Sequence, residues 1–504
     1  MTPRTDFPIA PLLDPIRRSL DAHPRLVLEA PPGAGKTTQV PPALLDAAWL
    51  EGRRIVMLEP RRIAARAAAE FMAAQRGEDV GATVGYRIRL ESRVSAATRI
   101  EVVTEGILTR MIQDDPELSG IGAILFDEFH ERHLSGDLGA ALALDIQANL
   151  RPDLRLVVMS ATLAGARIER WLDAPRIASE GRGFPVRIVH PALRGNDDPT
   201  ALRRAVTQAL AENEGDVLVF LPGKREIEQA RTMLSGAQER VDFVALHGEL
   251  SVADQHAALA PAKPGTRRVI LATNVAESSL TLPGIRAVVD TGLAREPRFD
   301  PASGFTRLET VSISQASADQ RAGRAGRLGP GACYRLWPES RRLDPDRTPE
   351  IAQVELSGLA LELAAWGSAD LRWLDAPPPG AFAQGRDLLD ALGALDRDGR
   401  ITALGQRMRA ASMHPRLAAM VVRADAAHAA FACDLAALVE ARNPLRGLPS
   451  DDFRARARAL GAWRTRDRAA ARDVGADIGA LASIAQVADA ARRRLGIRSA
   501  NATA

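Results

Sequence analysis

Short apolar runs separated by longer amphipathic stretches dominate the first 190 residues. The runs lie at residues 26–28, 55–58, 100–103, 124–126 and 156–159. Apolar runs of this length without polar alternation are typical of parallel strands buried on both faces, and the stretches between them have the character of helices. The pattern therefore predicts an α/β domain built on a parallel sheet.

A second series of apolar runs begins after a polar stretch at residues 194–199. Its members lie at residues 217–220, 243–246, 269–272 and 287–289. Because this series repeats the character of the first, two similar α/β domains in tandem are the simplest account. We expect a cleft between them.

The strand pattern stops after about residue 345, and Ala- and Leu-rich helical periodicity replaces it, as at residues 354–364 and 386–395. The sequence Pro-Pro-Pro-Gly at residues 377–380 predicts a short break in this half. Residues 396–404 are typical of a small hairpin that turns at Gly399, as in a winged-helix fold. The remainder is predicted to be helical.

The composition describes a globular protein without a membrane segment. The chain has 504 residues, of which 46% are hydrophobic, so three or four folding units are expected. No apolar run approaches the roughly 20 residues of a membrane span, and the first 20 residues lack the apolar stretch of a secretory signal. Cys333 and Cys433 stand far apart and outside any metal spacing. We therefore expect a cytoplasmic protein with reduced thiols.

Lysine is rare in this chain, and its few positions are informative. It occurs only at Lys36, Lys224 and Lys263, and the other 63 of the 66 basic residues are arginine. The net charge of +3 says little about partners. A compact ammonium fits between two phosphates where a planar guanidinium is too bulky. Lys36 is therefore predicted to be functional.

A glycine-rich segment follows the first predicted strand, in the place where a phosphate-binding loop belongs. Backbone N–H groups and the N-terminus of the next helix would then point at the phosphates. Lys36 would reach the β- and γ-phosphates and Thr37 a Mg²⁺ ion. Ala30 stands where the general pattern has Gly, and an ordinary turn is the alternative. The predicted nucleotide-binding residues are Gly33, Ala34, Gly35, Lys36, Thr37 and Thr38.

Two adjacent carboxylates, Asp127 and Glu128, end the fourth predicted strand. Such a pair is costly at a strand end unless a cation lies beside it. A Mg²⁺ ion oriented by Asp127 and a water polarised by Glu128 supply the reason, and an acid pair that caps the next helix is the alternative. His130 and His133 lie one helical turn apart, but no third ligand group is visible, so a polar coupling role is preferred.

Three arginines, Arg321, Arg324 and Arg327, are spaced three residues apart. This spacing predicts that they share one face of a helix, with Gly323 and Gly326 permitting close approach. A solvated basic face is the usual meaning of such a run. Its position after the second strand series favours arginine fingers that reach across the cleft.

In this order, the motifs resemble those of the DEAH-box group of superfamily-two helicases. Residues 127–130 read Asp-Glu-Phe-His, a Phe-for-Ala variant of the motif that names the group. The strings at residues 58–65, 104–108 and 273–281 are most similar to the HrpB-type bacterial ATP-dependent helicases. The resemblance covers nearly the whole chain.

The resemblance implies a fold of four parts. They are two RecA-like P-loop domains at residues 1–190 and 191–345, a winged-helix domain at 346–405 and a helical ratchet-like domain at 406–504. It implies ATP and Mg²⁺ as ligands and movement on single-stranded nucleic acid, RNA rather than DNA, with 3′→5′ polarity. We expect a monomer. Helicases of this group usually continue past the helical domain, so a shortened member or part of a longer protein is expected.

The resemblance also implies roles for individual residues. Glu128, Gln320, Arg324 and Arg327 would be catalytic, and Thr37, Asp127 and Glu128 would hold the metal. A strand-separating hairpin is expected between Arg295 and Leu308. Coupling residues would be His130, Ser160 and Thr162, and the nucleic acid would be contacted by Arg61, Arg62, Thr104, Gly223, Thr273 and Asn274.

Two other functions stay open. A P-loop kinase or GTPase would need a phosphoacceptor pocket or a guanine motif, and no Asn-Lys-x-Asp string occurs. A binding scaffold without catalysis would keep the fold, but the intact Lys36, Glu128, Arg324 and Arg327 argue against it. The choice of nucleotide is also open, because no upstream Gln-based adenine motif is apparent.

Overall fold

The computed structural model describes residues 7–161, 165–179, 183–192, 198–234, 241–248, 250, 252–263, 265–277, 282–300, 303–445, 452–473 and 475–498. The chain divides into two compact units. The first unit consists of Met1–Val354 together with Arg372–Ala376, and the second of Glu355–Leu371 together with Pro377–Ala504.

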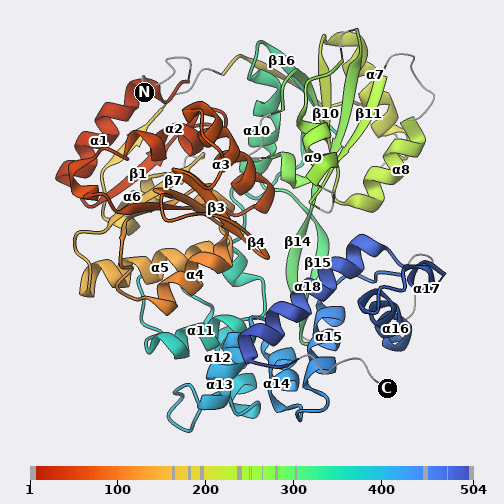
Figure 1. Ribbon diagram of the computed structural model, residues 1–504. Coiled ribbons are helices and arrows are strands. Elements are labelled where there is room, and N and C mark those ends of the chain that lie inside the picture. Colours follow the sequence, from red (N-terminus) through yellow and green to blue (C-terminus); the bar gives the residue numbers. More distant parts are fainter. Residues whose placement is uncertain are drawn as a thin grey trace. The chain divides into compact units, whose positions relative to one another are not determined.

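The first lobe of the first unit is built on an eight-stranded sheet with the order β4-β3-β5-β2-β6-β7-β1-β8 (Figure 1). Neighbouring strands pair in parallel except β3 and β4. All five predicted strands are confirmed. The strands are β1 (Arg25–Glu29), β2 (Arg54–Leu58), β3 (Val84–Ile88), β4 (Glu91–Arg93), β5 (Ile100–Val103), β6 (Ile121–Phe126), β7 (Arg155–Ser160) and β8 (Arg176–Ala178).

Helices cover both faces of this sheet, with α1, α2 and α3 on one side and α4 and α5 on the other (Figure 1). Helix α1 shows why they pack there, because Leu13, Ile16 and Leu20 recur on one face and are buried. The helices of this lobe are α1 (Leu13–Ala22), α2 (Lys36–Ala43), α3 (Arg62–Arg76), α4 (Glu105–Asp114), α5 (Leu134–Asn149) and α6 (Gly165–Leu172), with 3₁₀ turns η1 (Ala10–Leu12), η2 (Ala48–Leu50) and η3 (Phe129–Glu131).

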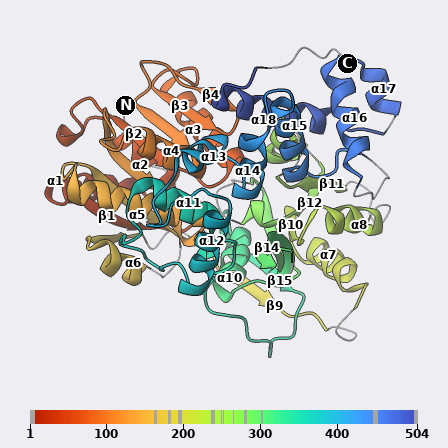
Figure 2. The same cartoon turned by 90° about the horizontal axis from the view of Figure 1, so that it is seen from below.

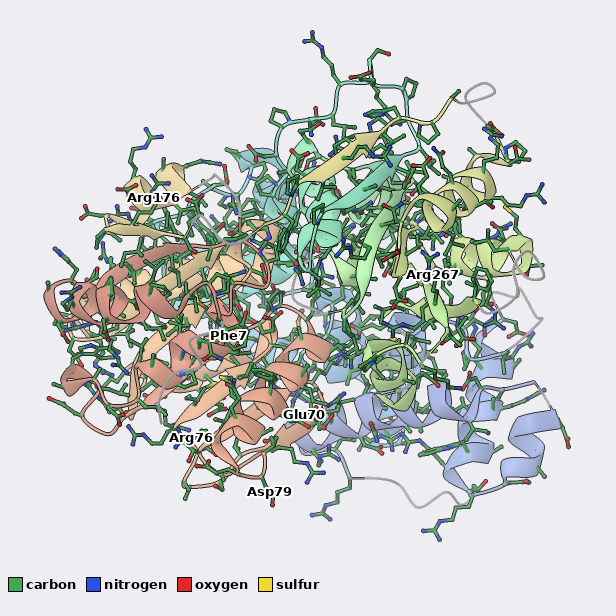
Figure 3. All side chains as sticks on the ribbon, turned by 90° about the horizontal axis from the view of Figure 1, so that it is seen from above. Phe7, Glu70, Arg76, Asp79, Arg176 and Arg267 are labelled. Carbon is green, nitrogen blue, oxygen red and sulfur yellow. The ribbon has the colours of Figure 1, made fainter. Side chains whose placement is uncertain are left out.

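The second lobe has a six-stranded sheet with the order β11-β12-β10-β13-β16-β9, and all of its neighbours pair in parallel. The four predicted strands are confirmed. Arg267 on β12 donates to the carbonyl oxygens of Leu210, Asn213 and Gly215 and so closes the C-terminal end of α7 (Figure 3). The strands are β9 (Val186–Val189), β10 (Asp216–Phe220), β11 (Val241–Leu246), β12 (Arg267–Ala272), β13 (Ile285–Asp290) and β16 (Gly331–Arg335).

A separate antiparallel hairpin projects from this lobe. Strands β14 (Leu293–Asp300) and β15 (Phe305–Ser312) pair along their whole length, so the hairpin expected between Arg295 and Leu308 is confirmed as a structure. Its role in strand separation stays a prediction. The remaining elements of the lobe are α7 (Ala201–Glu212), α8 (Lys224–Leu234), α9 (Val252–Leu259), α10 (Gln315–Gly323), η4 (Asn274–Ala276), η5 (Arg324–Gly326) and η6 (Glu350–Ala352).

The second unit is helical in the part that the structure describes. Helices α15 and α18 lie side by side in both views (Figures 1 and 2) and share an apolar core with α16. A second core is formed by α11 to α14. The helices are α11 (Ser357–Trp366), α12 (Pro379–Ala391), α13 (Ala403–Ala411), α14 (Pro415–Arg423), α15 (Ala429–Glu440), α16 (Phe453–Arg464), α17 (Arg468–Asp473) and α18 (Ile478–Leu495).

Three local predictions for this unit need correction. The helix predicted from residue 354 begins at Ser357, because the Glu355 carboxylate accepts the Ser357 backbone N–H at 2.8 Å. The helix predicted to end at residue 395 ends earlier because Gly393 adopts φ +67°. The hairpin predicted at residues 396–404 is a tight turn at Gly399 with one bridge between Leu395 and Ile401, without paired strands.

Within the described residues, no helix combines the length and the apolar character needed to span a bilayer. Cys333 and Cys433 are both buried and free of disulfide bonds.

Candidate active site

The predicted motifs gather at one edge of the first sheet. The glycine-rich loop follows β1, Asp127 follows β6, and Ser160 ends β7. These three strands are neighbours and run in parallel. Because the carboxyl ends of parallel strands meet at one edge, the topology brings the three segments together.

The glycine-rich loop depends on two left-handed glycines. Gly33 has φ +86° and Gly35, which precedes helix α2, has φ +94°. A methyl group on Gly35 would lie 2.9 Å from the ring of Phe7, and Ile9 donates its backbone N–H to the Ala34 carbonyl oxygen at 3.0 Å. The N-terminal segment with Phe7 (Figure 3) therefore covers the loop, a contact that sequence analysis missed.

The loop and the acid pair are in direct contact. The Lys36 ammonium lies 3.3 Å from Oε1 of Glu128, and both side chains are buried. Thr37 donates its hydroxyl to Oδ2 of Asp127 at 2.5 Å. Burial raises the pKa of Asp127 to about 6, against the lowering effect of Lys36. The predicted lysine, threonine and carboxylates thus form one cluster.

Glu128 sits at a strained point of the backbone. It adopts φ +50° and Arg132 adopts φ +52°, and between them lies the 3₁₀ turn η3 (Phe129–Glu131). Left-handed non-glycine residues cost about 1–3 kcal/mol each and cluster at active sites. Among the described residues, Oε2 of Glu128 has no hydrogen-bond partner, and it lies 3.5 Å from Nε2 of His130. One carboxylate oxygen is therefore available for a substrate atom.

His130 connects three motifs. Its Nδ1 accepts the backbone N–H of Ala161 at 3.2 Å, and burial lowers its pKa, so the neutral ring carries its hydrogen on Nε2. The amide nitrogen of Gln320 lies 3.2 Å from this Nε2, and the flipped amide would accept its hydrogen. The Ser160 carbonyl oxygen accepts the N–H of Ala30, at the start of the loop. Thr162 lies outside the described residues.

The interpretation of His130 and His133 as residues one helical turn apart is wrong. His130 lies in η3, whereas His133 precedes α5 as its N-cap residue. The left-handed Arg132 separates the two elements. Within the described part of the chain, no group of three or more His, Cys, Asp or Glu side chains could hold a metal ion.

Arg327 and Arg324 of the second lobe face the first. A methyl group on Gly33 would lie 3.5 Å from Cζ of Arg327, which places this guanidinium over the phosphate loop. Arg324 is buried and donates its Nε–H to the Glu277 carbonyl oxygen at 3.0 Å. Burial lowers the pKa of both arginines, that of Arg327 to about 10, and Glu128 opposes the shift. Arg327 therefore remains a cation at neutral pH.

The prediction that three arginines share one helix face is wrong, because helix α10 ends at Gly323 and Arg324 begins a 3₁₀ turn. Arg321 points back into its own lobe, where it lies 2.9 Å from both Glu277 and Asp290. Gly326 packs closely against the chain near residue 184, whereas a methyl group on Gly323 would meet no atom within 4 Å. Arg321 is thus a core residue of the second lobe.

The residues that are predicted to contact nucleic acid differ in their exposure and in their contacts. Arg61 donates to Glu131 at 3.0 Å and to the Asn274 carbonyl oxygen at 2.5 Å, so its charge is already paired. Arg62 is exposed at the start of α3, and Thr104 is the buried N-cap of α4. Thr273 precedes η4. A methyl group on Gly223 would lie 2.9 Å from Cζ of Arg295 on the hairpin.

An ion-pair network that sequence analysis missed lies behind the acid pair. Arg61 pairs with Glu131, and His133 lies 2.9 Å from Glu131 and 3.3 Å from Glu350. Burial alone would lower the pKa of His133, but the hydrogen bonds that its ring donates to the Glu131 and Glu350 carboxylates raise it to about 10. In the sequence, only the position of Glu131 directly after the motif at residues 127–130 pointed to this network.

Replacing His133 with Asn is expected to destabilise the protein by about 2 kcal/mol near pH 6. The folded-state pKa of about 10 exceeds the ordinary value of 6.5, so stabilisation is complete below about pH 6.5 and is lost as the pH rises towards 10. Thermal melts of both proteins across this range should converge at high pH. His428→Asn, at an exposed histidine, is the control. A pH-independent difference would exclude the charged ring as the cause.

A cavity of about 320 Å³ lies beside His130 and Gln320. Its lining also includes Glu277, Ser317, Arg132, Arg167, Ile168, Leu374 and Asp375. The cavity therefore borders His130, one of the predicted coupling residues.

Each of the two lobes matches a known protein family. Residues 16–171 match the DEAD/DEAH box helicase family, residues 199–329 the helicase conserved C-terminal domain, and residues 387–410 the winged-helix helicase-associated domain HA2. The matched segments contain the phosphate loop, the acid pair and the arginines. The chain belongs to the DEAD/DEAH-box helicase family. Each of its two sheets forms the centre of a RecA-like domain. The winged-helix domain and a helical region follow them.

Individual helicases are also similar to this chain. The ATP-dependent RNA helicase HrpB of Escherichia coli is 46% identical over 475 residues, which are 92% of this chain and 58% of that protein. The human protein named probable ATP-dependent RNA helicase DHX34 is 38% identical over 80% of this chain and 37% of its own length. A crystal structure of E. coli HrpB superposes with a TM-score of 0.87 at 43% identity, covering 98% of this chain and 61% of that one. The chain thus spans less than two thirds of the length of each of these relatives.

Proposed function

We propose that the chain is an ATP-dependent helicase that moves along single-stranded nucleic acid, RNA rather than DNA, with 3′→5′ polarity. The observation that carries the proposal is the position of Arg327 over Gly33, because a nucleotide in the loop would be enclosed by both lobes. The names of the HrpB and DHX34 relatives as ATP-dependent RNA helicases support it. We further propose a cytoplasmic monomer with domains at 1–190, 191–345, 346–405 and 406–504.

The residues present fit ATP with Mg²⁺. Backbone N–H groups of Gly33, Ala34, Gly35, Lys36, Thr37 and Thr38 would surround the phosphates at the N-terminus of α2. Thr37 and Asp127 supply the hard oxygen donors that Mg²⁺ prefers, and this ion usually takes few protein ligands beside phosphates and water. Glu128 stands next to them, and its Oε2 has no hydrogen-bond partner in the described part of the chain. When bound, Mg²⁺ would neutralise charge on the phosphates.

Each residue of the site would then have a distinct task. Glu128 would accept a proton from the attacking water, while Lys36, Arg324 and Arg327 would stabilise charge that develops on the transferred phosphoryl group. Gln320 would lie beside this group or its water. His130, with Ser160 and Thr162, would transmit the state of the site to the rest of the lobe.

The nucleic acid would be held through its backbone. We propose contacts from Arg62, Thr104, Gly223, Thr273 and Asn274, which carry no base identity. Arg61 belongs to the same track, but its pairing with Glu131 leaves less charge for a phosphate. We expect the hairpin of β14 and β15 to separate paired strands.

An ATPase assay with matched RNA and DNA oligomers over a salt series tests the proposal. We expect stimulation by RNA above that by DNA, with an apparent affinity that falls steeply with salt because phosphate contacts release counterions. A basal rate indifferent to both oligomers would favour another P-loop NTPase. Bound ATP without turnover would favour a binding scaffold.

A further inference from the structure

A five-residue segment, which we call the strap (Arg372–Ala376), belongs to the first unit although its neighbours in sequence belong to the second. The chain leaves the second unit after Leu371 and returns to it at Pro377. Its place in the first unit is therefore maintained by local contacts. Those contacts connect the strap to the turn that follows Glu128.

Asp375 of the strap joins two arginines from different elements. Its Oδ1 accepts a hydrogen bond from Arg167 of α6 at 2.6 Å, and its Oδ2 lies 2.6 Å from Nη1 of Arg132. Arg167 also donates to the Leu374 carbonyl oxygen at 3.1 Å. Trp171 of α6 donates its indole N–H to the Arg372 carbonyl oxygen at 3.1 Å. Three side chains of the first lobe thus hold the strap.

Two of these side chains also hold the turn that follows Glu128. Trp171 stacks on Phe129, with ring centroids 5.6 Å apart and planes inclined by 11°. The Arg132 guanidinium lies 6.0 Å from the centre of the same ring and forms a bidentate pair with Asp137 at 3.0 and 3.2 Å. Phe129 stands between Glu128 and His130 in the chain. An alanine at this position could not make the stack.

The strap also lines the cavity that borders the turn after Glu128. Leu374 and Asp375 line it together with His130 and Gln320. His130 itself is only 6% exposed. Loss of the strap would leave the turn without support on this side, and the left-handed Glu128 has a backbone conformation that needs such support.

We propose that Asp375 and Trp171 are positioning residues for ATP hydrolysis, which fix Glu128 and His130 from behind through Arg132 and Phe129. The inference rests on the proposed function and adds to it a determinant of the hydrolysis step. Neither residue belongs to the nucleotide loop. Their effect therefore falls on kcat and leaves nucleotide binding unchanged.

The test compares Asp375→Ala, Trp171→Ala and Trp171→Phe in RNA-stimulated ATPase assays, with fluorescent-ADP binding and thermal melts as further measurements. We expect kcat to fall about tenfold in both alanine variants, because small displacements of a catalytic group cost this much or more, with KM within twofold. Trp171→Phe keeps the stack on Phe129 and should retain most of the wild-type kcat. Asp370→Ala, at an exposed carboxylate outside the strap, is the matched control.

The outcomes separate the two proposals. If the wild-type chain turns over ATP and both alanine variants keep its kcat, the proposed role of the strap is overturned. The proposed function is not affected by that result. A fall in kcat with an equal loss of ADP binding would show a general structural effect and would also overturn the role of the strap. A wild-type chain without turnover would overturn the proposed function, and this inference with it.

Discussion

Replacing Glu128 with Gln is expected to reduce ATP turnover by about 100- to 10,000-fold, the range that a lost general base produces. The amide has nearly the same shape, so it keeps the packing beside Lys36 and His130. It cannot accept a proton from water. Binding of ATP and of single-stranded RNA should therefore persist, and the variant should remain on the strand with its nucleotide.

Single-turnover hydrolysis and equilibrium binding of labelled ATP and RNA measure this separation. Glu117→Gln, at an exposed carboxylate of the same lobe, is the control. Turnover near the wild-type rate in Glu128→Gln would remove Glu128 from the role of base.

Replacing Arg327 or Arg324 with Ala is expected to reduce kcat by about 1,000- to 100,000-fold, the range for arginine fingers. This corresponds to roughly 4–7 kcal/mol. Arg327 lies over the phosphate loop and Arg324 is fixed by the Glu277 carbonyl oxygen, so both are set to meet developing charge. Lysine should not restore the rate at either position, because an ammonium lacks the planar fork.

Arg321 provides a contrast within the same string of residues. Its guanidinium is buried against Glu277 and Asp290, so Arg321→Ala should lower the melting temperature, whereas Arg327→Ala should leave it unchanged. Steady-state ATPase rates and thermal melts of the three variants distinguish the roles. Wild-type turnover in Arg327→Ala would refute its role as a finger.

The apolar runs were sufficient to predict most strands of both sheets, since a buried parallel strand has a strong local signal. Strands β3, β4, β8, β9 and β16 escaped prediction because their residues are mixed in polarity or lie at sheet edges. The end of helix α10 escaped for another reason. The repeated Arg spacing suggested a continuing helix, whereas the chain tightens into a 3₁₀ turn at Arg324.

The cluster of Lys36, Thr37, Asp127 and Glu128 could be predicted because each motif carries its own signal and β-sheet topology joins them. The contacts around them could not. Phe7 over Gly35 joins segments that share no motif. The pairing of Arg132 with Asp375 joins residues more than 200 positions apart, and nothing near either residue announces it.

The central claim is that a triphosphate is held between the loop of one lobe and the arginines of the other. A crystal structure with ADP, Mg²⁺, aluminium fluoride and single-stranded RNA tests it directly. We predict Lys36 on one side of the fluoride and Arg324 and Arg327 on the other, within hydrogen-bond distance. A filled phosphate loop with both guanidinium groups turned away from the fluoride would contradict the account.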